Sequence, residues 1–167
     1  MYLTNVKEDV ISFFEKIETL DEFRKIKICI YIFNALNSGQ INDKNEANPY
    51  LIGDDIKIFS FSSIGLPNDL CCTILHYLEY YYNVNTNEKK AYDYDGIVIG
   101  VQYTQDDNEI VSIFEKLSFE NKLDVISEII IRLDNESFFE KIKLSNIFDI
   151  NTSGFNIANL INDYKKQ

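Results

Sequence analysis

The sequence predicts an α+β fold that is predominantly α-helical, in which helical hairpins pack around a small β-sheet of two or three strands. Apolar residues recur at helical spacing over most of the chain, and two short segments instead alternate like strands. The chain has 167 residues and an apolar fraction of 46%, which is enough to bury a core of its own. We therefore expect a single globular domain that spans residues 1–167.

The N-terminal part is expected to form a helical hairpin. Asn5 with Glu8 resembles a capping box for the first helix, and Thr19 with Glu22 repeats that pattern before a second helix over residues 20–37. Ser38-Gly39 would end the second helix. Its middle, IKICIYIF, is rich in β-branched residues and is also compatible with a buried strand, although we favour the helix. The residues expected to face inward are Val6, Val10, Phe13, Phe14, Ile17, Phe23, Ile26, Ile30, Phe33 and Leu36.

The centre of the chain holds the two predicted strands. They are IKIFSF at residues 56–61 and IVIGVQY at residues 97–103. Between them, Pro67-Asn68-Asp69 is typical of the start of a helix, whose apolar face would include Leu70, Ile74 and Tyr81.

The C-terminal part is expected to be helical after an acidic turn at residues 105–109. Candidate helices cover residues 110–117, 119–133, 137–144 and 155–164, and a break is expected at Ser118 and Asn121. The sequence SFFEKI occurs at residues 12–17 and 137–142, and SIFEKL occurs at residues 112–117. A duplicated hairpin would explain this echo, but the offsets share no fixed period, so we favour independent amphipathic helices.

The charge of the chain restricts its partners. Sixteen basic against 27 acidic residues give a net charge of −11, which disfavours direct contact with nucleic acid or with an anionic membrane surface. A basic protein partner is compatible with this charge, as is a simple role in solubility. We expect a cytoplasmic protein with free thiols, because no export signal is visible and the three cysteines are an odd number.

The stretch YDYDGIVIGVQY at residues 92–103 resembles a calcium-binding loop only in part. If Gly96 takes the place of the invariant glycine of such a loop, Asp93 and Asp95 fall at ligand positions. Ala91 and Gln102 then occupy the two positions that need the strongest ligands. An Asp-Gly turn that leads into a strand explains the stretch better.

Zinc and catalytic chemistry are also poorly supported. Cys29, Cys71, Cys72 and His76 lack the spacing of a closed zinc site, and buried cysteines are common in protein cores. The single histidine leaves few ways to build a nucleophile with a general base. We predict no catalytic residue, no metal and no cofactor, although an enzyme built on dispersed carboxylates stays open as an alternative.

One region has an unusual composition. Between residues 58 and 115 the only basic residues are Lys89 and Lys90, and tyrosines are frequent. Tyrosine is enriched at protein interfaces, and clustered carboxylates attract a basic partner. Solubility and packing are the ordinary explanation of the same pattern. The candidate partner-binding residues are the carboxylates Asp93, Asp95, Asp106, Asp107 and Glu109 and the tyrosines Tyr92, Tyr94 and Tyr103.

The leading hypothesis is therefore an acidic intracellular binding protein that inhibits a basic partner by masking its surface. Such a partner would be a toxin or a nucleic-acid enzyme, and the general character is that of immunity proteins and antitoxins. The alternatives are a helical scaffold or adaptor that binds a peptide in an apolar groove, and the carboxylate-based enzyme.

Overall fold

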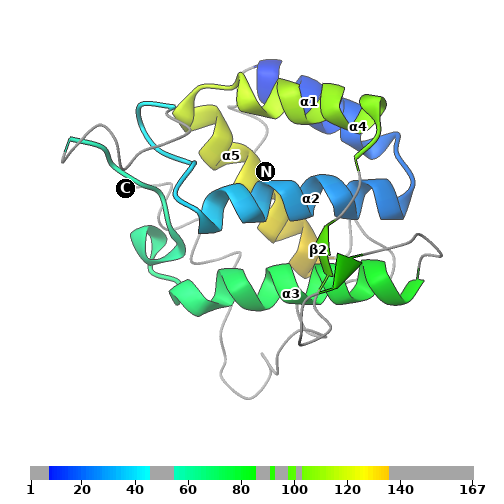
Figure 1. Ribbon diagram of the computed structural model, residues 1–167. Coiled ribbons are helices and arrows are strands. Elements are labelled where there is room, and N and C mark those ends of the chain that lie inside the picture. The colour runs from blue at the N-terminus through cyan, green and yellow to red at the C-terminus, as the bar shows by residue number, and fades with distance from the viewer. Residues whose placement is uncertain (1–7, 46–54, 86–90, 93–97, 101–102, 136–167) are drawn as a thin grey trace.

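The computed structural model describes residues 8–45, 55–85, 91–92, 98–100 and 103–135. Over these residues the protein is helical, and α2 lies between α3 on one side and the pair α1 and α4 on the other (Figure 1). The helices and strands are α1 (Glu8–Glu18), α2 (Glu22–Asn37), the short 3₁₀ helix η3 (Phe61–Ile64), α3 (Asn68–Asn85), β1 (Ala91–Tyr92), β2 (Val98–Gly100), α4 (Gln105–Glu115) and α5 (Phe119–Asn135).

The prediction of a β-sheet packed among the helices is wrong. At residues 56–61, Ile58 forms only an isolated antiparallel bridge with Asn42, and Phe61 already belongs to η3. At residues 97–103, β2 pairs with the two-residue strand β1 through an irregular antiparallel register. The alternating pattern of IKIFSF instead reflects two aromatic side chains, Phe59 and Phe61, that are buried in the helical core.

Helix α2 is the central helix of the fold. Its residues Ile26, Ile28, Ile30, Ile32 and Phe33 are all at most 1% exposed, although they point in different directions around the helix. Burial on every side explains why IKICIYIF shows no helical periodicity and also resembles a buried strand. The local signals favour the helix, which ends at the C-cap Ser38 and is followed by Gly39 with a φ of 79°.

The two predicted N-terminal helices are confirmed, but α1 packs mainly on α4 and α5 rather than on α2 as a hairpin would require. A different residue from the one predicted also caps the second helix. Thr19 does not cap α2, because its hydroxyl donates to the carbonyl of Lys16 at 2.7 Å. The N-cap is Asp21, whose carboxylate accepts a hydrogen bond from the backbone N–H of Arg24 at 3.0 Å. Val10, Phe13, Phe14 and Ile17 of α1 are buried as predicted, while Asn5 lies outside the described residues.

Replacing Asp21 by Ala is expected to lower the free energy of unfolding by about 1 kcal/mol, because the first turn of α2 loses the acceptor of its cap. Urea unfolding followed by circular dichroism measures this change. The matched control is Asp21→Asn, which keeps a side-chain acceptor and should lose less than half as much. Equal losses in both variants would show that the cap is not the cause.

The acidic segment at residues 105–109 was predicted as a turn and is instead the first part of α4. The hydroxyl of Thr104 accepts from the backbone N–H of Asp107 at 3.2 Å, and the carboxylate of Asp107 accepts from the N–H of Thr104 at 3.0 Å. This reciprocal capping box fixes the start of the helix. The predicted break is confirmed, since the hydroxyl of Ser118 accepts from the N–H of Asn121 at the start of α5.

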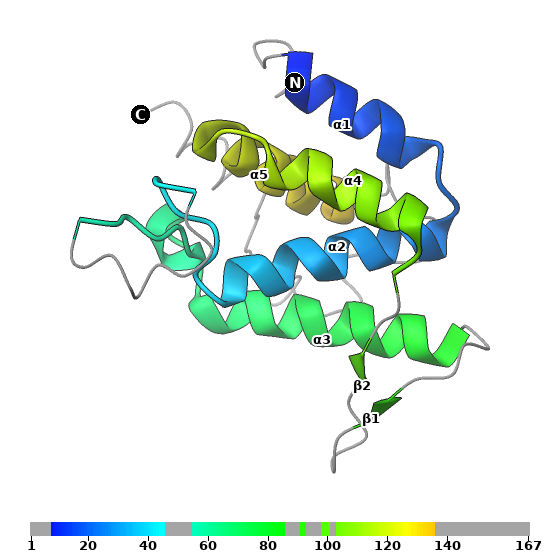
Figure 2. The same ribbon diagram turned by 45° about the horizontal axis from the view of Figure 1, so that its top comes forward.

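The two helical pairs α1–α2 and α4–α5 resemble each other in length. Helices α1 and α4 have 11 residues each, and α2 and α5 have 16 and 17. Helices α1 and α4 run side by side in opposite directions (Figures 1 and 2), and the rings of Phe13 and Phe114 lie 6.0 Å apart. The similar sequences SFFEKI and SIFEKL therefore belong to α1 and to α4 with its C-terminal end, and these two helices are in contact. The third copy, at residues 137–142, lies outside the described residues.

Candidate functional site

The acidic, tyrosine-rich segment that the sequence singles out is described in part. Asp93, Tyr94 and Asp95 lie outside the described residues, and Tyr92 is placed through its backbone in β1 alone. The four remaining candidates lie just before or within the first turns of α4. They are Tyr103, Asp106, Asp107 and Glu109.

Asp107 is an internal carboxylate rather than a surface one. Its side chain is fully buried, and it accepts from Lys27 Nζ at 2.8 Å and from Arg24 Nε at 3.0 Å. Burial alone would raise its pKa, but the hydrogen bonds from Lys27, Thr104 and Arg24 lower the pKa from 3.8 to about 2. In this arrangement Asp107 anchors α4 to α2 and presents no charge to a partner.

Tyr103 is half-buried beside this ion pair. Its hydroxyl donates to the backbone carbonyl of Lys27 at 3.2 Å, and its ring meets the ring of Tyr31 edge-on with the centroids 6.2 Å apart. Burial raises the pKa of the hydroxyl, and the negative charge of Asp107 raises it further. Tyr103 therefore packs α4 onto α2, with only part of its surface open to solvent.

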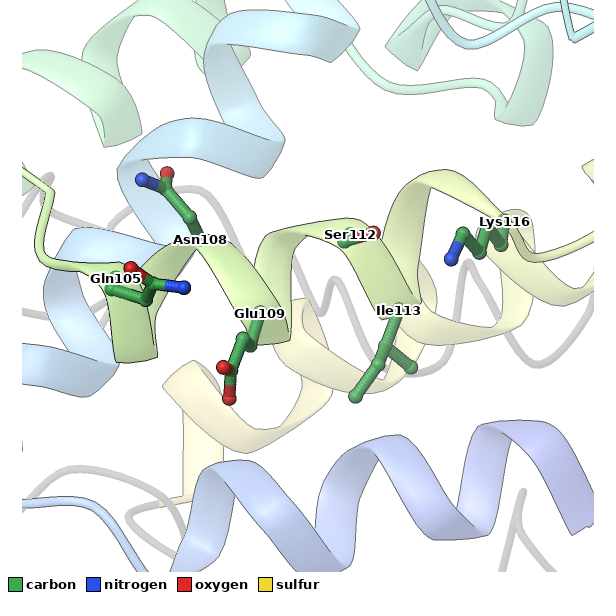
Figure 3. A pocket seen from close by; sticks show the side chains of 6 residues that line it. All are labelled: Gln105, Asn108, Glu109, Ser112, Ile113 and Lys116. Atoms are coloured by element: carbon green, nitrogen blue, oxygen red, sulfur yellow. The ribbon is translucent and has the colours of Figure 1, made fainter.

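Asp106 and Glu109 are the described candidates that face solvent, and Glu109 lines an open hollow along one side of α4. The hollow has a volume of about 670 Å³. Figure 3 shows Glu109 and Ile113 projecting on the same side of the helix, while Asn108 projects on the other side. The helical spacing places two residues of opposite charge, Glu109 and Lys116, together with one apolar and three amide or hydroxyl side chains within a single surface. The lining residues are Gln105, Asn108, Glu109, Ser112, Ile113 and Lys116.

The tyrosines of α3 differ widely in exposure. Tyr80 is 65% exposed, whereas Tyr82 is 1% exposed and belongs to the core. Tyr81 is partly buried and stacks on Phe23 at a centroid distance of 6.3 Å. Tyr80 is thus the tyrosine of this helix with the most surface to offer a partner.

Helix α1 adds charged residues that the sequence analysis does not include in the site. Glu8, Asp9 and Glu15 are exposed on α1, which lies against α4 (Figure 2). These three residues are far from residues 92–109 along the chain, so the sequence does not show that α1 and α4 are neighbours. The amphipathic pattern of α1 already indicates that they face outward, but only the packing places them beside α4.

The cysteines and the histidine do not come together. Cys29 is fully buried, and burial raises its pKa; Cys71 is also buried, with its pKa raised to about 12. Cys72 contacts the side-chain oxygen of Asn37 at 3.4 Å, and His76 is exposed. Within the described part of the chain, no three His, Cys, Asp or Glu side chains are arranged to hold a metal ion.

Glu79 on α3 is a buried carboxylate that the sequence analysis overlooks. It is 9% exposed, and no described residue donates a hydrogen bond to it or forms an ion pair with it. Burial raises its pKa, an effect that the nearby His76 partly offsets. Buried charges without partners destabilise a fold, so Glu79 is a weak point in the core. Glu79 is not among the described residues that line the hollow along α4, the hollow beside Lys122 or the hollow between the C-terminal end of α2 and η3.

Replacing Glu79 by Gln is expected to raise the free energy of unfolding by about 1 kcal/mol near pH 7, because the amide keeps the shape of the side chain without the buried charge. A raised pKa means that the folded state favours the protonated acid. The wild-type protein should therefore gain stability as the pH falls from about 7 towards 5, and the variant should gain less.

Thermal and urea unfolding at the two pH values measures both effects. Glu109→Gln on the exposed side of α4 is the matched control and should change stability by less than about 0.5 kcal/mol. A Glu79→Gln variant less stable than wild type at both pH values would contradict this account of Glu79.

No helix in the described ranges carries an apolar stretch long enough to cross a bilayer. Comparison with protein-family models, with curated proteins and with solved structures finds no match for this chain.

Proposed function

We propose that the protein is an acidic binding module that inhibits a basic protein partner by covering its surface, as immunity proteins and antitoxins do. The observation that carries the proposal is the exposed side of α4, where Asp106 faces solvent and Glu109 lines an open hollow of about 670 Å³. The net charge of −11 supports it, because such a field accelerates association with a cationic surface.

The surface we propose for the partner is smaller than the set of residues predicted from the sequence. Asp106 and Glu109 supply charge, and the hollow beside Glu109 gives a place for a basic side chain of the partner. Asp107 and Tyr103 support this surface from inside through their contacts with Lys27. The contributions of Tyr92, Asp93, Tyr94 and Asp95 stay predictions.

A cytoplasmic location is part of this proposal. Cys29, Cys71 and Cys72 are free thiols, as expected in a reducing compartment.

The two alternative functions receive less support. A peptide-binding adaptor requires that the apolar faces of Phe13 and Phe114 be open, but these side chains are at most 1% exposed and pack against each other. A carboxylate enzyme requires an acid of raised pKa in a pocket, and Glu79, whose pKa is raised, is not among the described residues that line the hollow along α4 or the hollow beside Lys122.

The test begins with affinity capture from native cells, with the wild-type protein and an Asp106→Asn/Glu109→Gln variant as baits. The control bait is Asp55→Asn/Asp69→Asn, which removes the same charge from exposed positions away from α4. We expect one basic protein to be captured by the wild type and the control and to be depleted with the α4 variant.

Binding kinetics with the captured protein then test the mechanism. The association rate should fall at least about tenfold between about 50 and 500 mM salt, and the α4 variant should associate roughly fivefold more slowly than the control. An acidic captured protein, or rates that change with neither salt nor the α4 substitutions, would overturn the proposal.

A further inference from the structure

The loop after α2 approaches the corner between α4 and α5 (Figures 1 and 2). Residues of α2, of this loop and of the corner line a second hollow. Its volume of about 330 Å³ is within the range of small-molecule sites. Apolar groups from Ala35, Ile41 and Phe114 form part of its lining, and Lys122 and Glu115 bring opposite charges to it. It shares no lining residue with the hollow along α4.

Lys122 is the unusual group in this hollow. The residue is 6% exposed, and its Nζ donates to the side-chain oxygen of Asn45 at 3.1 Å and lies 5.9 Å from the centre of the Phe114 ring. No described carboxylate lies within 4.0 Å of this ammonium, although acidic residues outnumber basic ones in the chain by 27 to 16. Burial lowers the pKa of Lys122. A buried ammonium has three protons to donate and here has one described acceptor, so it can bind a further anion.

Asn45 is held in an unusual backbone conformation at the same place. Its φ of 51° lies in the left-handed region, and its amide nitrogen donates to the carbonyl of Leu117 at 3.3 Å. The two hydrogen bonds of Asn45 fix the loop against the α4–α5 corner and hold the acceptor for Lys122. The site is therefore built from three separate segments that support one another.

Glu115 is the complementary charge. It is exposed, and its carboxylate accepts a hydrogen bond from the hydroxyl of Tyr31. Glu115 acts electrostatically on Lys122, yet the two groups do not form an ion pair. Opposite charges that line one cavity without touching leave room for a ligand that carries both charges.

We propose that this hollow binds a free amino acid with an apolar side chain. The ligand carboxylate would accept from Lys122, its ammonium would donate to Glu115, and its side chain would lie against Phe114, Ile41 and Ala35. A polyanion such as a nucleotide fits less well, because Glu115 and the net charge of −11 repel it. The inference is independent of the proposed binding of a protein partner.

The binding test uses three probes, L-leucine, L-methionine and L-phenylalanine, titrated into the full chain and followed by NMR and calorimetry. At least one should bind with a dissociation constant on the order of 100 μM, which suits a ligand of this size. L-leucinamide, which lacks the carboxylate, and 4-methylpentanoate, which lacks the ammonium, should each bind at least about tenfold more weakly than L-leucine.

Substitutions of Lys122 and Glu115 test which charged group of the amino acid each residue binds. Lys122→Met keeps the apolar stem and should weaken amino-acid binding at least about tenfold, whereas Lys116→Met at the same corner should have no effect. Glu115→Gln should weaken binding of the amino acid but not of 4-methylpentanoate. Thermal unfolding of each variant checks that it is folded.

Three results would overturn the proposal. One is the absence of binding by all three amino acids up to about 10 mM. Another is equal binding of L-leucine and 4-methylpentanoate, which would assign the hollow to plain carboxylates such as a peptide C-terminus. The last is unchanged binding in a folded Lys122→Met variant.

Discussion

Replacing Asp107 by Asn is expected to lower the free energy of unfolding by about 3 kcal/mol, although the residue lies in an acidic segment that resembles a surface turn. The carboxylate is fully buried, and the side chain of Lys27, its partner at 2.8 Å, is only 6% exposed. Loss of one member of a buried ion pair leaves the other charge without its counter-ion in a medium of low dielectric constant. Urea unfolding followed by circular dichroism measures the loss.

Three further variants separate the roles of Asp107. Asp106→Asn, next to it but exposed, should change stability by less than about 0.5 kcal/mol. Thr104→Val removes the hydroxyl of the capping box alone and should cost about 1 kcal/mol. Lys27→Met combined with Asp107→Leu replaces the ion pair by apolar groups and should recover most of the loss. Equal stability of Asp106→Asn and Asp107→Asn would contradict the buried ion pair.

The same carboxylate contributes to acid unfolding. Its pKa in the folded protein is about 2, below the ordinary value of 3.8, so the folded state favours the ionised form. The stability from this group is present above about pH 4 and is lost as the pH falls from about 4 towards 2. The stability of Asp107→Asn should therefore change less over that interval than the stability of the wild type.

Replacing Phe33 by Ala is expected to cost about 4 kcal/mol, because it leaves a cavity in the centre of the core. Phe33 on α2 is 0% exposed, and its ring meets the ring of Phe61 edge-on at 6.5 Å. This ring contact links α2 to Phe61, which is the first residue of η3 and the last residue of the segment 56–61 predicted to be a strand. Urea unfolding measures this change as well.

Two variants keep this prediction testable if Phe33→Ala does not fold. Phe33→Leu retains most of the buried volume and should cost about 1 to 1.5 kcal/mol. Tyr80→Ala removes an aromatic ring that is 65% exposed and should cost less than about 0.5 kcal/mol. Similar losses for Phe33→Leu and Tyr80→Ala would show that Phe33 is not a central core residue.

Features that depend on neighbours along the chain could be predicted from the sequence. The apolar face of α1, the stop at Ser38-Gly39, the start of α3 after Pro67 and the break at Ser118 all follow from local spacing and turn chemistry. The helical character of α4 could also have been inferred, because Thr104 and Asp107 have the spacing of a capping box.

Features that depend on distant partners could not be predicted in this way. IKIFSF has the composition of a strand, but a strand needs a paired neighbour, and Ile58 finds only the single bridge to Asn42. Asp107 looks like any other surface carboxylate until α2 brings Arg24 and Lys27 to it. The hydrogen bond between Lys122 and Asn45, which are 77 residues apart, could not be predicted for the same reason.

The central position of α2 has a consequence for the synthesis of the protein. Arg24 and Asp107 are 83 residues apart, so a ribosome that adds roughly 5 to 20 residues per second needs about 4 to 17 s after Arg24 to add the residue that pairs with it. During that interval α2 has neither α4 nor α5 to cover its isoleucines. The nascent α2 therefore exposes apolar surface until α4 has been synthesised, and we expect chaperones to bind the chain most during this period.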